Sequence, residues 1–399
     1  MSKRAVGIII SGFFTLFVSF AIRYAYGLLL PYMLPSLAIS KTGAGIIYSS
    51  YFIAYTVFSP VLGLLVDRYD ARVLLSSFVA ILGIGAYLMS FSSTVIHASL
   101  FFALAGIGHS ACWVPVVTVV QRWVSERRRA TVLAIVDLGS ASGIAVWSII
   151  IPLIVGTFSW RGGWVSLGLL AFLVAGMNFF LMRSRPPVES DTQAPRAAFS
   201  ARMPIKAVYI AIFRDAKFYL IGLSYLLISF SILIPFAFLA TYATQELLIP
   251  YKSAAGLVAL IAVAGAFGKL FLGHLSDIVS RIRVMMLCGA LTAAGALGMA
   301  YAQGFFVLAI FTTVFGIGYG TIWPVYAASA RDFFSKEYAG SVIGLWTLYH
   351  GIGSILSPMI AGWTIDATGS YVWAFILAMI SAAMSLLLLV PIARARKMA

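Results

Sequence analysis

The sequence has very few charged residues. Only 10% of its 399 residues are Asp, Glu, Lys or Arg, whereas 62% are hydrophobic. A typical soluble domain carries about 25% charged residues. Two soluble domains would fit the length, but they would need far more polar surface than this chain can supply. The composition therefore indicates a membrane protein.

Cysteine and histidine are also scarce, and no phosphate-binding loop is present. The two cysteines, Cys112 and Cys288, lie in apolar runs, which is typical of small buried residues. Two cysteines and four scattered histidines supply no disulfide framework, no set of metal ligands and no nucleophile–base pair. No glycine-rich run ends in Lys-Ser or Lys-Thr, as an ATP-binding loop would. We therefore expect no cofactor, no enzymatic activity and no ATP-driven pump.

The long apolar runs predict membrane-spanning helices. In hydrocarbon, backbone polar groups must be hydrogen-bonded within their own segment, and about 20 residues cross the bilayer core. The first run is too long for the core of a cleaved signal peptide, which is about 7–15 residues. Twelve runs qualify: 5–33, 44–66, 73–92, 96–121, 130–155, 163–182, 217–244, 253–276, 284–302, 305–330, 339–364 and 371–392.

The distribution of basic residues predicts the orientation in the membrane. Lys and Arg outnumber Asp and Glu by 27 to 12. If the N-terminus is cytoplasmic, the inside segments hold 22 Lys and Arg, and the outside loops hold only Lys41, Arg161 and Lys252. Such an excess on one side is the positive-inside pattern. We expect a cell (inner) membrane protein with both termini cytoplasmic, and the basic excess then needs no nucleic-acid partner.

The two halves of the chain repeat at an offset of 210 residues. Gly106-Ile107-Gly108 recurs as Gly316-Ile317-Gly318, Trp113 as Trp323, and Asp67 as Asp277. Residues 183–216 between the halves are polar and rich in proline, which is typical of a linker. We predict an all-α protein of two pseudo-symmetric six-helix bundles, residues 1–182 and 217–399, joined by a cytoplasmic linker. This is a transporter architecture.

The loop after the second run resembles a signature of the major facilitator superfamily. It reads Gly63-Leu64-Leu65-Val66-Asp67-Arg68-Tyr69-Asp70-Ala71-Arg72, with Asp70 where that family usually has glycine. A weaker copy, Gly273-His274-Leu275-Ser276-Asp277, lacks the arginine after the aspartate. The resemblance, which covers essentially the whole chain, implies gating roles for Asp67, Arg68, Arg72 and Asp277.

Within that superfamily the chain resembles the monocarboxylate-porter and oxalate/formate-antiporter branches. The similar stretches are 26–31, 265–270 and 319–324. Those branches usually place an arginine in helix 8 to hold the substrate carboxylate, and Lys269 occupies what resembles that place. The monocarboxylate porters also have an aspartate one turn earlier, where this chain has Gly265.

Three charges are expected well inside helices, where such residues face a cavity or pair with each other. They are Arg23, Asp137 and Lys269. At 1.5 Å per residue, Lys269 and Asp137 both lie about 10–12 Å from the cytoplasmic ends of their helices. We predict that Lys269 binds the anion, while Asp137 accepts the coupling proton or exchanges partners with Lys269; a static buried pair is the alternative. Arg23 is a second anion-binding candidate, although its side chain could instead extend to the membrane interface.

Other candidates are polar aromatic residues near the same depth. His350 and His109 could line a cavity or serve as hydrogen-bonded core residues. The resemblance makes His350 the better candidate, because the oxalate/formate branch carries a basic residue at about this depth of helix 11, and histidine could titrate near neutral pH. Tyr319 and Trp323 lie one turn apart on one helix face, so they form either a cavity wall or ordinary packing.

The sequence therefore predicts a monomeric secondary transporter of a small organic anion, with a monocarboxylate favoured. Protons in symport or a counter-anion in exchange would drive it across the lipid bilayer. An exporter of hydrophobic or cationic compounds is the first alternative, but Asp137 is the only deep acid and two cations outnumber it. A nitrate-type carrier is a weaker alternative. An enzyme would need the nucleophile–base set or ligand clusters that the sequence lacks, and a receptor would not need the 210-residue repeat.

Overall fold

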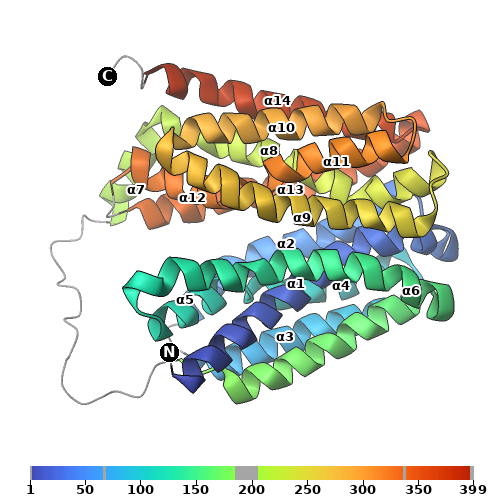
Figure 1. The fold of residues 1–399 in the computed structure, drawn as a ribbon, viewed down its shortest axis with the longest axis horizontal. Helices are drawn as coiled ribbons and strands as arrows, with labels where there is room; N and C mark the ends of the chain where they lie inside the picture. Colours follow the sequence, from blue (N-terminus) through green and yellow to red (C-terminus); the bar gives the residue numbers. More distant parts are fainter. Residues whose placement is uncertain (1, 66–68, 185–204, 336–337, 396–399) are drawn as a thin grey trace.

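The computed structural model describes residues 2–65, 69–184, 205–335 and 338–395 (Figure 1). The described residues form helices joined by short connections, and no strand occurs among them. The helices are α1 (Lys3–Leu37), α2 (Lys41–Leu65), α3 (Ala71–Met89), α4 (Val95–Ser110), α5 (Val114–Trp123), α6 (Glu126–Leu181), α7 (Ile205–Arg214), α8 (Ala216–Gln245), α9 (Tyr251–Ile278), α10 (Arg281–Ala300), α11 (Phe305–Gly320), α12 (Ile322–Phe333), α13 (Ala339–Thr368) and α14 (Val372–Ala395).

These helices match the twelve expected spans. Ten described segments, with α4–α5 and α11–α12 each taken as one, are long and apolar enough to cross a membrane. One of them, α6, contains two expected spans, because its backbone leaves the helical conformation at Ser159, where φ is 61°. The segment returns antiparallel after that residue (Figure 1). The 25-residue helix α2 supplies the remaining span.

Two of the expected spans are interrupted. The fourth and tenth spans are broken rather than continuous, between α4 and α5 and at Thr321 between α11 and α12. Pro115 and Pro324 lie just after the two breaks; proline lacks the N–H that would continue the helix and crowds the preceding turn. Within the expected linker, residues 183–216, the structure describes the helix α7.

Glycine contacts show that the two halves are pseudo-symmetric. A Cβ on Gly106 would lie 2.3 Å from the carbonyl oxygen of Tyr51, and a Cβ on Gly316 would lie 2.9 Å from that of Ile261. Tyr51 and Ile261 are themselves 210 residues apart. The same offset relates the contact of Gly85 with Ala105 to that of Gly295 with Phe315. The repeat therefore preserves the close helix crossings that build each bundle.

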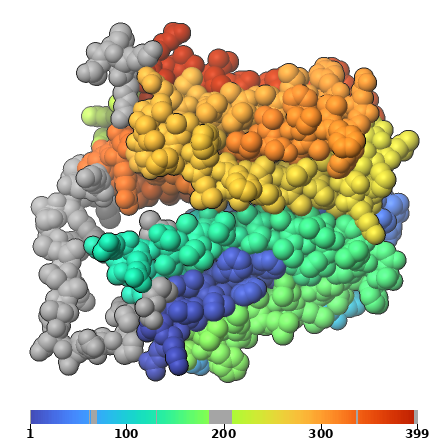
Figure 2. Space-filling view, in the orientation of Figure 1, coloured from blue at the N-terminus to red at the C-terminus, as the bar shows by residue number. Residues whose placement is uncertain are grey.

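The two bundles contact each other closely at one end and separate at the other. We call the end that holds both chain termini the terminal face, and the opposite end, with residues 38–40, 91–94, 246–250 and 369–371, the loop face. In Figure 1 the terminal face is on the left. The space-filling view shows the halves parted there and joined toward the loop face (Figure 2). The structure is therefore open toward the terminal face.

Candidate functional site

An ion pair joins the two halves on the terminal-face side of the centre. The ammonium group of Lys269 on α9 donates a hydrogen bond to Oδ2 of Asp137 on α6. Their side chains are 32% and 16% exposed, respectively. Ser140 Oγ, one turn along α6, donates to the backbone carbonyl of Asp137 and lies 3.4 Å from its Oδ1. The sequence placed both charges at one depth, and the structure brings them into direct contact.

The local packing of α9 explains why the acid comes from the opposite half. Lys269 lies on a helix surface where α9 and α11 are very close: a Cβ on Gly320 would lie 1.8 Å from the carbonyl oxygen of Gly265. A Cβ on Gly265 would lie 3.0 Å from the ring of Tyr319. An aspartate at position 265 would have to displace that ring. Asp137 supplies the carboxylate instead, from across the interface.

Arg23 is the most deeply buried charge among the described residues. Its side chain lies in the middle of α1 and the residue is 4% exposed. Neither Nε nor Nη2 has a hydrogen-bond partner among the described residues. The guanidinium carbon lies 4.6 Å from the ring centroid of Phe52 and 5.3 Å from that of Tyr24. Cation–π contacts of this kind stabilise a desolvated guanidinium by about 2 kcal/mol, but they satisfy none of its N–H donors.

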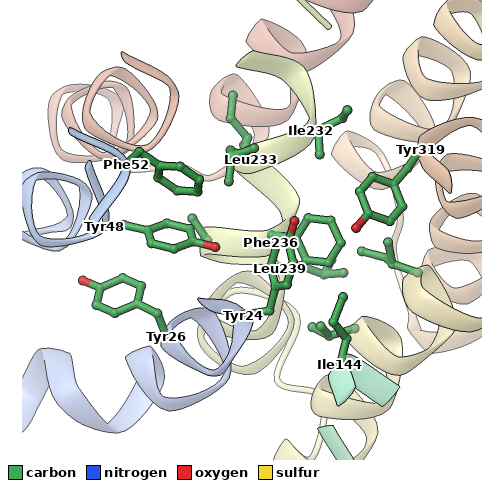
Figure 3. Packing of buried hydrophobic residues seen from close by; sticks show 14 of the residues in the cluster. Tyr24, Tyr26, Tyr48, Phe52, Ile144, Ile232, Leu233, Phe236, Leu239 and Tyr319 are labelled. Atoms are coloured by element: carbon green, nitrogen blue, oxygen red, sulfur yellow. The ribbon is translucent and has the colours of Figure 1, made fainter. Parts of the chain in front are cut away.

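A continuous series of aromatic rings leads from Arg23 into the other half. Figure 3 shows Phe236 between Tyr24 and Tyr319; the centroid of Phe236 lies 4.1 Å from that of Tyr24 and 5.0 Å from that of Tyr319. Tyr319 makes an edge-to-face contact with Trp323 at 5.3 Å, and Trp323 makes another with His350 at 5.5 Å. The structure thus joins Arg23, Tyr319, Trp323 and His350 through one set of contacts, of which Phe236 is the link that the sequence analysis missed.

The two buried histidines have hydrogen-bond partners on different halves. His350 Nδ1 lies 2.6 Å from Ser229 Oγ, whose own proton is donated to the carbonyl of Tyr225 at 2.6 Å. His109 Nδ1 donates to the carbonyl oxygen of Ser19 at 3.2 Å. Each histidine is held in one orientation by an α1 or α8 partner, so both interpretations of the sequence remain open for their roles.

The motif residues lie at the terminal face, away from this aromatic series. The guanidinium of Arg72 lies 4.0 Å from the ring centroid of Phe179. Oδ1 of Asp277 lies 3.4 Å from Nη2 of Arg281, and Arg281 also forms an ion pair with Asp332. The Arg72 contact lies within the N-terminal half and the Arg281 contacts lie within the C-terminal half, so none of them joins the two halves. Asp67 and Arg68 lie outside the described residues, so the structure says nothing of their contacts.

Other polar residues that the sequence analysis did not single out connect helices within or between the halves. Asn178 accepts hydrogen bonds at Oδ1 from Ser11 at 2.5 Å and Thr15 at 3.0 Å, which ties α6 to α1. Asp366 joins α13 to α2. Neither residue belongs to a repeated motif, and its partners are more than 160 residues away, so no local pattern indicates them.

Comparison with known proteins identifies the family. The model of the Major Facilitator Superfamily matches residues 12–270 and 221–398. The chain is 25% identical to a hexuronate transporter of Bacillus subtilis, over 94% of this chain and 92% of the relative. It is 24% identical to the monocarboxylate transporter 12-B of Danio rerio, over 80% of this chain and 72% of the relative.

Solved structures share the fold. A point mutant of the nucleoside transporter NupG aligns with a TM-score of 0.80 at 15% identity, covering 96% of this chain and 98% of that one. A bacterial homologue of the human lysosomal transporter Spinster, in an inward-facing conformation, aligns with a TM-score of 0.79 at 14% identity, covering 98% and 95%. The family model, which matches residues 12–270 and 221–398, shows that the chain is a membrane transporter that belongs to the Major Facilitator Superfamily.

Proposed function

We propose that the protein is a secondary transporter of a small monocarboxylate, driven by proton symport or anion exchange. The observation that carries this proposal is the guanidinium of Arg23. It is almost fully buried at the centre of the molecule, yet two of its nitrogens have no acceptor among the described residues. A carboxylate is the small group that satisfies such a donor pair best, since arginine binds it in bidentate fashion.

Lys269 and Asp137 would couple anion binding to the movement of the two halves. The pair spans the interface on the terminal-face side, which the basic residues predict to be cytoplasmic. A substrate carboxylate that binds Lys269 competes with Asp137 for the same ammonium group. Release of Asp137 would free it to take up a proton or to exchange partners, while the halves move apart or together.

The relatives narrow the substrates that should be tested. One is named a hexuronate transporter and others monocarboxylate transporters. A hexuronate also carries a single carboxylate, so one anion-binding site is compatible with both names. A carrier of cationic compounds would instead need unpaired acids in its centre, whereas Asp137 is already paired with Lys269.

Uptake by purified protein in liposomes tests the proposal. Labelled lactate, pyruvate, formate, oxalate and glucuronate would be compared with a neutral sugar and an organic cation, each with and without a pH gradient. We expect saturable uptake of at least one carboxylate and none of the cation. Uptake of the cation alone, or of the neutral sugar alone, would refute the proposal.

Substitution of Arg23 connects the activity to the site. Hydrogen bonds to charged groups contribute about 1.5–3 kcal/mol, so Arg23→Gln should raise KM for the carboxylate about tenfold or more. The matched control is Arg161→Gln, because Arg161 donates to Ser36 and to the Ser92 carbonyl at the loop face. That variant should retain the parent KM. An unchanged KM in Arg23→Gln would remove Arg23 from the binding site.

A further inference from the structure

The helix α2 begins at the loop face with an unusual cap. The first N–H groups of a helix have no partners within the helix. Ser40, just before α2, accepts from the backbone N–H of Gly43 at 3.0 Å. The carboxylate of Asp366 accepts from the N–H of Lys41 at 3.0 Å and from that of Thr42 at 2.7 Å. Thr42 Oγ1 donates to the same carboxylate at 2.6 Å.

This cap comes from the opposite half of the transporter. Asp366 lies near the end of α13, whereas α2 belongs to the N-terminal bundle. Its negative charge is placed at the positive end of the α2 dipole, a favourable arrangement, and all three hydrogen bonds are charge-assisted. The residue therefore stabilises a contact between halves rather than a helix of its own bundle.

The backbones approach so closely because of two glycines. A Cβ on Gly362 would lie 2.1 Å from the carbonyl oxygen of Lys41, and a Cβ on Gly45 would lie 2.1 Å from that of Pro358. Opening of the loop face must separate α2 from α13 in this region. It would leave the Asp366 carboxylate and the backbone donors of α2 to be solvated by water, and the three hydrogen bonds would be lost together.

We propose that Asp366 is a positioning residue that latches the loop face closed, and that it sets how often this face opens. The inference rests on the alternating-access part of the proposed function and not on the identity of the substrate. The sequence repeat supports a specialised role, because the position 210 residues earlier is Gly156, which has no carboxylate. The latch therefore exists on one side of the pseudo-symmetric pair only.

The chain offers a matched control in Glu246. Its carboxylate accepts from Ser370 Oγ and from the N–H of Tyr371, each at 2.9 Å, just before α14 begins. The chemistry is similar, a carboxylate next to a helix start at the loop face. Both groups of this contact belong to the C-terminal half, however, so rigid-body opening would not break it.

Spin-label distances across the loop face test the latch without substrate. Ile96 and Phe306 are 70% and 80% exposed, lie in opposite halves and occupy equivalent repeat positions, so cysteines there can carry the labels. The two natural cysteines are buried. In Asp366→Asn and Asp366→Ala, we expect the population with the longer label distance to rise about 5- to 30-fold, as for loss of a contact worth about 1–2 kcal/mol.

The controls separate a latch from general destabilisation. Glu246→Gln should keep the parent distance distribution, and Thr42→Val, which removes one of the three donors, should shift it less than Asp366→Ala. Asp366 variants with the parent distribution would overturn the proposal, as would an equal shift in Glu246→Gln. Because no substrate is used, failure here is distinguishable from failure of the carboxylate uptake assay.

Discussion

Separating the ion pair between Lys269 and Asp137 should distinguish an anion-binding lysine from a static structural pair. Lys269→Gln leaves a carboxylate of α6 without its cation, and Asp137→Asn leaves the ammonium without its acid. The double variant removes both charges. A role in structure alone requires only that the charges match, whereas a role in binding requires the ammonium group itself.

The size of the effect follows from the partial burial of the pair. Exposed ion pairs contribute about 0–1 kcal/mol, and breaking a fully buried pair costs about 3–5 kcal/mol. With side chains 32% and 16% exposed, the pair lies between these limits, so we expect a coupling of about 1–2 kcal/mol, or about a 5- to 30-fold change in conformational population.

Two readouts are needed, the kinetics of carboxylate uptake and the separation of the halves at the terminal face. Spin labels at Ser125 and Arg331, exposed positions in opposite halves, report the separation. Each single variant should increase it, and the double variant should return toward the parent. KM should stay raised about tenfold or more in both variants that lack Lys269. Arg281→Gln, which breaks an ion pair within one half, is the control and should leave KM unchanged.

The reasoning would be refuted by normal uptake and an unchanged KM in Lys269→Gln. Recovery of both the distance distribution and the KM in the double variant would refute the binding role alone, because it would leave a static pair as the sufficient explanation.

Three further predictions concern packing. Gly27→Ala should reduce transport and favour an open loop face in distance measurements, because its Cβ would lie 1.9 Å from a backbone oxygen of α8. Gly106→Ala and Gly316→Ala should both lower the melting temperature in detergent, the former more, whereas Gly176→Ala should not, since nothing lies within 4 Å of its Cβ. Asn178→Leu should cost about 1–3 kcal/mol by leaving the buried Ser11 hydroxyl without its acceptor, measured as reduced thermal stability; the Thr15 hydroxyl still donates to the Ser11 carbonyl. Equal stability of all these variants would contradict the packing argument.

The sequence was sufficient to predict the helices and their duplication. Apolar runs determine which segments cross the membrane, because the energetic cost of an unpaired backbone group in lipid leaves few alternatives. The 210-residue offset then relates one bundle to the other, and the Gly85, Gly106, Gly295 and Gly316 contacts follow the same offset. The depth of Lys269 and Asp137 could also be predicted, since it needs only the helical rise.

Contacts between the halves could not be predicted in the same way. Phe236 resembles any other apolar residue in its run, yet it links Tyr24 to Tyr319. Asp366 lies near a helix end, where a carboxylate is ordinarily solvated, and its partners are more than 300 residues away. The helix breaks at residues 111–113 and at Thr321 lie just before Pro115 and Pro324, and hydropathy, which measures only apolar character, does not report them.

The intrahelical charges to which we assign anion binding and coupling lie at positions where the two halves differ. Packing glycines repeat at the common offset, because both bundles need the same close crossings. The three charges inside the helices do not repeat: the counterpart of Arg23 is Leu233, that of Asp137 is Thr347, and that of Lys269 is Ser59. The repeat relates the two halves within each face, so a fully symmetric pair of halves would make every contact between them twice, once on either side of the pseudo-two-fold axis. With one ion pair toward the terminal face and the Asp366 cap at the loop face, the two closures have different chemistry, so an anion or a proton can act on one of them without acting equally on the other.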